Sequence, residues 1–420
     1  MITPWEVEGV VDYQKLIEEF GITPFTDLLR SIPSPHRLMR RGVVFGHRDY
    51  WRILEAMKKG KDFSVMSGFM PSGDIHFGHK MTMDEIIWHQ KMGATAFVAI
   101  ADIEAHLVRG ISWEKTREIG MGYVKSIIAL GLEKDSFIYF QSKNDKVKNL
   151  ALELSSEVNF NEIRSIYGFV GETQIARAIV SLIQSADILQ PQLEEFGGSK
   201  PVVVPVGADQ DPHLRLTRDL AARMNLFSLE KIEGGMRIRS KKNEMLTKIE
   251  KLGFEFRRFS GHLDIFGDPE KIEKAVRTLE MELGSYAFVP PSSIYHKFTT
   301  GLTGGKMSSS KPESYISLFE KPENAVKKIK NALTGGRNTA EEQRRLGGEP
   351  WKCVIFELYT YHLIESDDEL SRIKEDCECG KILCGACKKI AEEILLEFLK
   401  SHKEKSDAVE SILDEFTIIS

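Results

Sequence analysis

The chain has 420 residues, of which 42% are hydrophobic, and this is enough for a large core and more than one domain. Its formal net charge of −5 argues against a protein that coats nucleic acid non-specifically, so any nucleic-acid partner needs a local basic face. No apolar run approaches the about 20 residues of a membrane span, and the N-terminal MITPWEVEGVVDY lacks the basic start of a signal peptide. We therefore expect a cytoplasmic protein with no membrane segment.

The first part of the chain, 1–60, is charged and helix-like, and we interpret it as an N-terminal extension. Its strings PHRLMRRG and HRDYWRILEAMKKGK are typical of a basic surface that leads into a helix. From Phe63 the pattern changes, because the short apolar runs FSVM, ATAFVAIA, SFIYF and PVVVPV alternate with helical segments. This alternation predicts an α/β fold with a doubly wound parallel (Rossmann-type) sheet over 61–330.

Two further regions follow from the periodicity. Residues 232–285 read as strand, helix, strand, helix, which predicts a small α/β module inserted into the larger domain. Beyond Lys321 the pattern is helical to the end of the chain, and we expect an all-helical C-terminal domain over 331–420.

The first predicted strand runs into GFMPSGDIHFGHK, a turn-rich loop that opens onto a helix. Free N–H groups and the helix dipole make such a place a binding site for anions. His76 and His79 are spaced so that both imidazoles can face one site, and Gly78 between them leaves room for a flat base against the backbone. The alternative is that both histidines lie on the surface or cap the helix.

A second string, TGLTGGKMSSSKP, lies more than 200 residues later in the chain. It places Lys306 on a loop behind the glycine pair Gly304 and Gly305. A lysine on such a loop can close over bound phosphates only if the sheet brings both strings together.

PSGDIHFGH and KMSSS, in this order, resemble the HIGH and KMSKS signatures of class I aminoacyl-tRNA synthetases. The resemblance implies that His76 and His79 contact the phosphates of ATP and that Gly78 packs under its adenine. It implies that Lys306 stabilises the transition state and the leaving pyrophosphate. These two histidines and Lys306 are the catalytic residues that it implies, and ATP with Mg²⁺ is the expected cofactor.

The chemistry of the implied reaction requires no protein nucleophile. The carboxylate of the amino acid attacks the α-phosphorus, so that catalysis rests on positioning and charge neutralisation. Ser309 stands where the family usually has a second lysine, and whether Lys311 replaces it stays open. The ATP-binding residues implied by the resemblance are Pro71, Ser72, Gly73, His76, Gly78, His79, Gly207, Asp209, Lys306, Met307, Ser308, Ser309 and Ser310.

The segment VPVGADQDPHLRLTRDLAARMN, 204–225, closely resembles the GxDQxxHxxLTRD segment of tryptophanyl-tRNA synthetases. The tyrosyl enzymes share only its GxDQ part. The resemblance implies that Gly207 and Asp209 bind the ribose and that Gln210 binds the amino or carboxyl end of the amino acid. The alternative for Asp209 and Gln210 is N-capping of the next helix.

A further string, LIQSADILQ, resembles the helix that lines the side-chain pocket in both enzymes, with Asp187 in place of the acid that accepts the indole N–H. Indole only donates, so one acceptor in an apolar wall suits it. Tyrosyl enzymes also use an aspartate here, but Met66 and Val180 stand where they usually carry tyrosines. The alternative for Asp187 is an acid on a solvent-facing helix surface.

The segment AIADIEAHL also matches the family, with Glu104 where eukaryote-type tryptophanyl enzymes bind the substrate ammonium group. Ala99 and Ala101 stand where those enzymes have glutamine and threonine. The tryptophan-binding residues implied by the resemblance are Asp187, Gln184, Gln210, Glu104 and Met66.

The linker TGGRNTAEEQRRLGG resembles its counterpart in archaeal and eukaryotic tryptophanyl enzymes, and the likeness covers nearly the whole chain except 232–285. It implies an anticodon-binding C-terminal domain, tRNA(Trp) as a partner and a homodimer. Helices rich in Arg and Lys suit RNA loops. Within 232–285, MRIRSKK and FEFRRF fit either a tRNA-contacting face or a solvated surface.

Five cysteines need their own interpretation, since four of them lie in CECGKILCGAC. Cys353, Cys377, Cys384 and Cys387 could hold Zn²⁺ or a [4Fe-4S] cluster as thiolates, with Cys379 extra. Some bacterial tryptophanyl enzymes carry an iron-sulfur cluster on nearly this spacing. The alternative is a set of reduced thiols with no metal.

The resemblance as a whole implies a ligase that activates L-tryptophan with ATP and transfers it to the 3′ end of tRNA(Trp). A tyrosyl enzyme is the nearest rival. A small nucleotidylyltransferase would share the HxGH-like loop but not the long helical tail. An RNA-binding regulator derived from a synthetase would be expected to have lost His76, His79 or Lys306, all of which are present.

Overall fold

The computed structural model describes residues 13–305, 307 and 311–419 of the chain. The chain forms two compact units. The first consists of the N-terminal part through Asp145 with 203–211 and 292–420, and the second of 146–202 and 212–291. The domain boundaries expected near residues 60 and 330 stay predictions. Each compact unit combines segments that are separate in the sequence, so neither boundary coincides with an edge of a unit.

The first unit is built on an eight-stranded sheet in the order β1-β2-β11-β6-β3-β4-β5-β12. Strand β3 runs parallel to β4, with Met66 opposite Phe97, and β11 runs parallel to β6. The four apolar runs named above form β3, β4, β5 and β6, which confirms the Rossmann-type prediction. The strands are β1 (Thr23–Pro24), β2 (Val44–Arg48), β3 (Ser64–Phe69), β4 (Thr95–Ile100), β5 (Ser136–Phe140), β6 (Val202–Gly207), β11 (Ser292–His296) and β12 (Thr417–Ile419).

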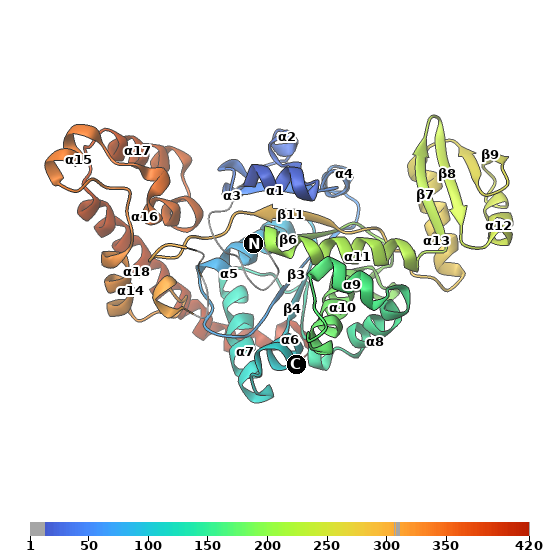
Figure 1. The fold of residues 1–420 in the computed structure, drawn as a ribbon, viewed down its shortest axis with the longest axis horizontal. Coiled ribbons are helices and arrows are strands. Elements are labelled where there is room, and N and C mark those ends of the chain that lie inside the picture. The colour runs from blue at the N-terminus through green and yellow to red at the C-terminus, as the bar shows by residue number, and fades with distance from the viewer. Residues whose placement is uncertain (1–12, 306, 308–310, 420) are drawn as a thin grey trace. The chain divides into compact units, whose positions relative to one another are not determined.

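Helices follow the parallel strands and complete the α/β pattern, as Figure 1 shows for α5 after β3. Helix α5 (Phe77–Lys91) connects β3 to β4, and α6 (Asp102–Arg109) and α7 (Trp113–Leu130) connect β4 to β5. Helix α7 is bounded locally, since the Ser112 side chain accepts from the Lys115 N–H at its start and Gly131 ends it with φ 112°.

The N-terminal part is more deeply integrated than a basic surface extension would be. It forms α1 (Tyr13–Phe20), α2 (Thr26–Leu29), α3 (Arg37–Arg40) and α4 (Trp51–Lys59), while β2 pairs antiparallel with β11. The expected basic surface is wrong for Arg37, whose guanidinium is buried beside the Asp84 carboxylate at 2.8 Å. A buried partner of opposite sign, far along the chain, makes that burial possible.

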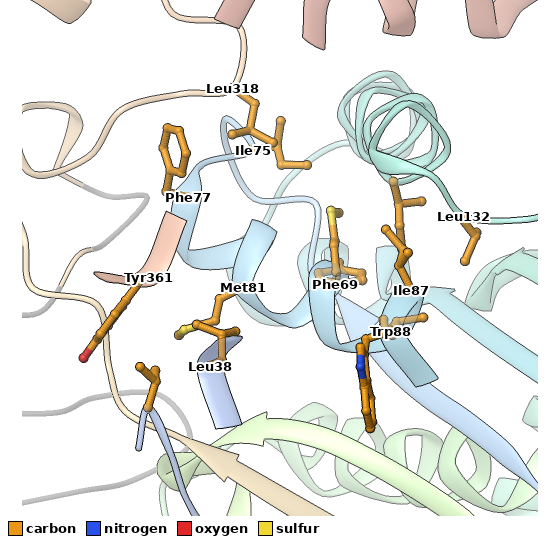
Figure 2. Close-up of a cluster of buried hydrophobic side chains, with 14 of the residues drawn as sticks. Leu38, Phe69, Ile75, Phe77, Met81, Ile87, Trp88, Leu132, Leu318 and Tyr361 are labelled. Carbon is orange, nitrogen blue, oxygen red and sulfur yellow. The ribbon is translucent and has the colours of Figure 1, made fainter. Parts of the chain in front are cut away.

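The C-terminal part belongs to the same unit and shares its hydrophobic core (Figure 2), where Tyr361 lies in one cluster with Leu38 and Met81. Its helices are α14 (Pro322–Asn331), α15 (Ala340–Leu346), α16 (Val354–Leu358), α17 (Asp367–Glu378) and α18 (Cys384–Val409), and a π-helix spans Tyr359–Leu363. Helix α18 packs against α7 and α14. The prediction of helix to the end of the chain is wrong at β12, because its β-branched residues extend the sheet beside β5.

The second unit contains α8 (Asp145–Leu154), α9 (Phe160–Tyr167), α10 (Ile175–Leu189) and α11 (Asp211–Met224), followed by a separate four-stranded sheet. That sheet has the order β7-β8-β10-β9 and its own apolar core. Its elements are β7 (Phe227–Ile232), β8 (Gly235–Ser240), α12 (Leu246–Glu250), β9 (Glu255–Arg258), β10 (Leu263–Phe266) and α13 (Pro269–Glu282).

The inserted module therefore differs from the predicted strand, helix, strand, helix order. The first expected strand is β8, which pairs antiparallel with β7 just before the predicted bounds, and the second is the antiparallel hairpin of β9 and β10. The first turn is tight and contains Gly234 at φ 77°, a conformation that glycine adopts without strain.

Candidate active site

Three loops leave the carboxyl ends of neighbouring parallel strands in the first unit. The loop after β3 carries His76, the loop after β6 carries Gly207, and the segment after β11 leads towards KMSSS. In an open parallel sheet, ligands bind at this edge where the strand order reverses. The fold therefore gathers the strings that the sequence places more than 200 residues apart.

His76 and His79 form a reciprocal cap at the start of α5. Nδ1 of His76 accepts from the Gly78 N–H at 3.1 Å, and Nδ1 of His79 accepts from the His76 N–H at 3.2 Å. The two ring centroids lie 4.0 Å apart. The capping interpretation is thus correct for the Nδ1 atoms, but it uses only one nitrogen of each ring.

The hydrogen bond at Nδ1 determines whether Nε2 of the same ring carries a proton. Since Nδ1 accepts a hydrogen bond, the proton of each neutral imidazole resides on Nε2, which becomes a donor. Burial lowers the pKa of His76 well below its usual range, and burial lowers the pKa of His79 to about 4. The helix start therefore presents two neutral Nε2–H groups at neutral pH.

Gly78 permits this arrangement by lacking a side chain. A Cβ at this position would lie 2.9 Å from Cε1 of His76 and 3.7 Å from the sulfur of Met307. Met307 is the residue of KMSSS that the structure describes, and its N–H donates to the Thr299 carbonyl at 2.9 Å. The sulfur of Met307 therefore places the KMSSS string beside Gly78 of the HxGH string. Lys306, Ser308, Ser309 and Ser310 lie outside the described residues.

The glycines before Lys306 shape the loop that leads to it. Gly304 and Gly305 have φ values of 93° and 72°, in the left-handed region that glycine favours. The Gly301 N–H donates to the Gly305 carbonyl at 2.8 Å, which closes the loop on itself.

The segment after KMSSS returns to the helix start. The Leu318 N–H donates to the Ile75 carbonyl at 2.9 Å, and the two side chains lie together in Figure 2. Tyr315 places its ring 4.9 Å from the His76 ring. A cavity of about 560 Å³ lies beside this segment, and its lining includes Asp74, Thr303 and Lys327. The residues that flank the lysine loop thus border an open space next to the histidines.

The loop before α5 is supported from α7. The Tyr123 hydroxyl donates to the Gly73 carbonyl at 3.0 Å, while Pro71 is buried and Ser72 is partly exposed. These contacts fix the backbone of PSGD relative to the sheet.

Gly207 ends β6, and Asp209 and Gln210 follow it in a short 3-10 turn, with Asp209 buried. A Cβ on Gly207 would lie 2.6 Å from Oδ1 of Asp209, so the glycine makes room for that carboxylate. The next residue, Asp211, was missed by the sequence analysis. Its fully buried carboxylate accepts from Arg48 Nε at 2.9 Å and from the Tyr295 hydroxyl at 2.6 Å, which ties the loop to β2 and β11.

Met66 and Glu104 also belong to the first unit. Met66 is buried on β3, and Glu104 is buried in the first turn of α6 after β4. Asp102, two residues earlier, accepts from the Ser142 N–H at 3.0 Å and from its hydroxyl. It anchors the start of α6 to the end of β5, a contact for which the sequence gives no spacing signal.

Asp187, Gln184 and Val180 lie on α10 in the second unit. Asp187 is only 3% exposed, so the interpretation as a solvent-facing acid is wrong. Within the same helix, Ser181 and Ser185 are also buried, and the Thr217 hydroxyl on α11 donates to Ser185 at 3.0 Å. The part of α10 from Val180 onward is therefore largely buried, whereas its first turn is exposed.

A buried acid-base pair connects α5 to β11. His296 Nδ1 lies 2.9 Å from Oε2 of Glu85, which is fully buried, and burial raises the pKa of Glu85. Glu85 stands two turns after the histidines, and His296 ends the strand that leads to KMSSS. The pair fixes the helix that carries His79 against the strand that precedes Lys306.

Comparisons with known proteins agree with this geometry. The family model described as tRNA synthetases class I (W and Y) matches residues 58–249 and 270–400. A tryptophan–tRNA ligase of Archaeoglobus fulgidus is 65% identical over 100% of this chain and 99% of its own length. One of Methanosarcina acetivorans is 53% identical over 100% of this chain and 98% of its own length. The chain belongs to the tryptophanyl-tRNA synthetase family.

Structural comparison supports the same family. The crystal structure of tryptophanyl-tRNA synthetase from Aeropyrum pernix matches with a TM-score of 0.77 and 41% identity, covering 99% of both chains. Among the residues described here, no helix is both long and apolar enough to cross a membrane.

Four cysteines of this synthetase-family chain line one small cavity of about 20 Å³. They are the predicted Cys353, Cys377, Cys384 and Cys387, whereas Cys379 is exposed. Burial, together with the neighbouring thiols, raises the pKa of Cys387 to about 12. Across 13–305, 307 and 311–419, no three or more His, Cys, Asp or Glu side chains are placed to bind a metal ion.

Proposed function

We propose that this chain is a tryptophan–tRNA ligase, which activates L-tryptophan with ATP and then transfers it to the 3′ end of tRNA(Trp). The full-length identity of 65% to such a ligase carries the proposal. The HxGH cap at the carboxyl end of β3, beside Met307, supplies the matching chemistry. ATP, tryptophan and tRNA(Trp) are the expected substrates, and ATP enters with Mg²⁺.

In the first step the tryptophan carboxylate attacks the α-phosphorus, and pyrophosphate leaves. The Nε2–H groups of His76 and His79 donate to phosphate oxygens without adding charge to a buried site. Lys306 brings a positive charge, which pairs with the negative charge that develops on pyrophosphate as it departs. The protein contributes fixed donors and charge, because the substrate already contains the nucleophile.

The loop after β6 holds the sugar and the amino acid end in this proposal. Gly207 leaves space beside Asp209, whose carboxylate accepts from the ribose hydroxyls. Gln210 binds the amino or carboxyl end, and Glu104 binds the ammonium group. Pro71, Ser72 and Gly73 support the nucleotide from the loop before α5.

Tryptophan selectivity rests on Asp187 in this proposal, and Gln184 and Met66 are also assigned to tryptophan binding. A buried carboxylate is a strong acceptor for the indole N–H, and an amino acid without a donor at that place cannot make this bond. Tyrosine also has a donor, so the apolar Met66 and Val180 contribute to its rejection by removing polar partners for a phenol.

The variant Asp187→Asn tests this assignment, with Asp219→Asn as a matched control on an exposed helix surface of the same unit. We expect kcat/KM for tryptophan activation to fall about tenfold or more in the first variant, since a charged acceptor is replaced by a neutral one. The control should equal the wild type. Equal tryptophan activation by Asp187→Asn and wild type would remove Asp187 from the site.

A homodimer is proposed on the basis of exposed hydrophobic side chains in the second unit. Five exposed large hydrophobic side chains lie on or between α8, α9 and α10: Leu152, Phe160, Val170, Ile175 and Ile179. Such a concentration is typical of an interface. Light scattering should give the mass of a dimer for the wild type and of a monomer for Ile175→Glu; a monomeric wild type contradicts the proposal.

A [4Fe-4S] cluster held by Cys353, Cys377, Cys384 and Cys387 is the second part of the proposal. Four thiols around one cavity are the donor set of such a cluster. Glycines adjoin the sulfurs, because a Cβ on Gly336 would lie 2.5 Å from Sγ of Cys384. The cluster takes no part in the ligation steps above.

Anaerobically purified protein tests the cluster. We expect a brown sample that absorbs at about 400 nm and contains iron. The absorbance and the iron should be lost in Cys384→Ser. The variant Cys379→Ser, which alters the exposed cysteine, should keep both. A colourless, metal-free wild type shows that the four thiols stay reduced without a metal, and a colourless sample with zinc shows a mononuclear site.

A further inference from the structure

A cavity of about 490 Å³ lies in the first unit along one face of α5. Residues 80, 84, 87, 88 and 91 of this helix line it, at the spacing of a single helical face. The N-terminal segment, α7 and the C-terminal helices supply the other walls. None of the residues assigned above to ATP, tryptophan or the cysteine cavity lines it, so it is a separate space.

The lining carries an excess of positive charge. Arg37, Lys80, Lys91 and Lys405 face two carboxylates, Asp84 and Glu365. Asp84 lies 2.6 Å from Nζ of Lys80 and 2.8 Å from a guanidinium nitrogen of Arg37. Arg37 is also paired with the Glu365 carboxylate, so the excess positive charge of the lining comes from Lys91 and Lys405. In the described part of the chain, Lys91 and Lys405 form no ion pair, and both are exposed at the cavity.

His362 lines the same cavity and is only 6% exposed. Neither of its ring nitrogens has a hydrogen-bond partner among the described residues. A buried polar group without a partner costs free energy, and such groups usually have a function or a missing ligand. The ring packs against Phe77 at 5.0 Å, so its position is fixed by the core.

Aromatic surface accompanies the charge. Trp88 and Phe398 line the cavity, and Lys80 lies 5.5 Å from the centre of the Phe398 ring. Phe398 and His402 are stacked with centroids 5.8 Å apart and an angle of 12°. Flat aromatic faces beside cations suit a nucleobase with an attached phosphate. The volume lies within the range of about 300–1,000 Å³ that small-molecule sites have.

We propose that this cavity, hereafter the α5 flank cavity, is a second ligand site that binds a nucleoside phosphate. Lys91 and Lys405 at the surface attract the phosphate, and His362 supplies the buried hydrogen-bond partner. The aromatic rings of Phe398 and Trp88 hold the base. The ligand is either a free nucleotide or one nucleotide of an RNA chain, since both present the same chemistry.

The test measures nucleotide binding to the full chain after its active site has been filled with a non-hydrolysable tryptophanyl-adenylate analogue. Calorimetry with AMP, GMP, CMP and UMP should show one site per chain. The double variant Lys91→Glu/Lys405→Glu should weaken it about tenfold or more, because each reversal turns attraction into repulsion at the opening. His362→Phe should weaken it as well, while keeping the contact with Phe77.

Lys403→Glu is the matched control, because Lys403 is an exposed lysine of α18 that does not line the cavity. It should bind nucleotides as the wild type does. Inorganic phosphate alone should bind more weakly than a nucleotide, since it has no base to stack. The lysine variants involve exposed side chains, and an unchanged unfolding temperature confirms that they fold.

Competition separates the two sources of the ligand. If tRNA(Trp) displaces the nucleotide and binds the double variant less tightly, the site receives a nucleotide of RNA. If tRNA(Trp) leaves the nucleotide bound, the site receives a free nucleotide. The proposal is overturned if the wild type, with its active site filled, binds neither nucleotide nor RNA at the cavity, or if the double variant and the wild type bind equally.

Discussion

Helix α5 is flanked by histidines in two different states. At its start, His76 and His79 use Nδ1 to cap the helix, so each ring has a defined proton position. Along its flank, His362 is as buried as His76 but has no hydrogen-bond partner among the described residues. The first pair is a finished part of a reaction site. The second environment is complete only when another molecule supplies the partner.

The helix start and the α5 flank cavity also differ in how they arise from the sequence. The reaction site follows from a short string, because capping and presentation of Nε2 both depend on residues within one helical turn. The α5 flank cavity draws on four separate parts of the chain, and none of its residues stands in a motif.

The largest effect is expected for Lys306→Ala. Loss of the charge that meets the leaving pyrophosphate should lower the rate of adenylate formation by about 2–4 kcal/mol in transition-state terms, with tryptophan binding nearly unchanged. ATP–pyrophosphate exchange and tryptophan titration measure the two quantities. Lys311→Ala is the paired variant, and a comparable loss there shows that Lys311 replaces the lysine missing at Ser309. An unchanged exchange rate in Lys306→Ala refutes its role.

A smaller effect separates the two nitrogens of His79. His79→Asn keeps an acceptor near Nδ1 but has no donor at Nε2, whereas His79→Gln places a donor near Nε2 and loses the cap. We expect adenylation to fall about 100-fold, or about 2.7 kcal/mol, in the Asn variant and less in the Gln variant. Stability should show the opposite order, with about 1 kcal/mol lost on removal of the cap.

Exchange assays and urea unfolding of both variants give the comparison. The same order for activity and stability contradicts the separate tasks of the two nitrogens. His362→Phe serves as the control from the flank cavity, and its exchange rate should equal that of the wild type.

The smallest effect is expected in the pH dependence of folding stability, which involves most of the histidines. Eight of the eleven have a lowered pKa, with burial as the main cause, among them His36, His47, His89 and His402, each at about 4. Below the unfolded pKa of about 6.5, the unfolded chain binds more protons than the folded chain. Stability should therefore be full above pH 6.5 and fall as the pH drops towards 4.

Each buried histidine contributes at most about 1.4 kcal/mol per pH unit to that fall. His362→Phe should remove one such contribution and flatten the curve between pH 6.5 and 4.5. Chemical unfolding at several pH values measures this slope. A curve for the variant that stays parallel to that of the wild type would mean that His362 is already protonated in the folded chain.

Much of the fold and part of the site could be predicted from sequence. Apolar runs of β3, β4, β5 and β6 stand clear of their neighbours, so the parallel sheet was predicted correctly. The HxGH string located the start of α5 because capping depends only on nearby residues. The contact between Met307 and Gly78 agrees with the expectation that the sheet unites the two strings.

Contacts between residues that are distant in the sequence could not be predicted from local patterns. Arg37 looked like a surface cation because its partner Asp84 is distant in the chain, and Asp211 gains its role from Arg48 and Tyr295. Strand β12 depends on the free edge of β5, which no local pattern reveals. Such residues are determined by tertiary contacts and not by spacing, and the flank cavity belongs to the same class.

The most direct test of the central claim is ATP–pyrophosphate exchange measured with each of the twenty amino acids. We expect rapid exchange with tryptophan and little with any other amino acid, tyrosine included, followed by transfer of tryptophan to tRNA(Trp). Exchange that is as fast with tyrosine as with tryptophan, or absent with tryptophan, would contradict it.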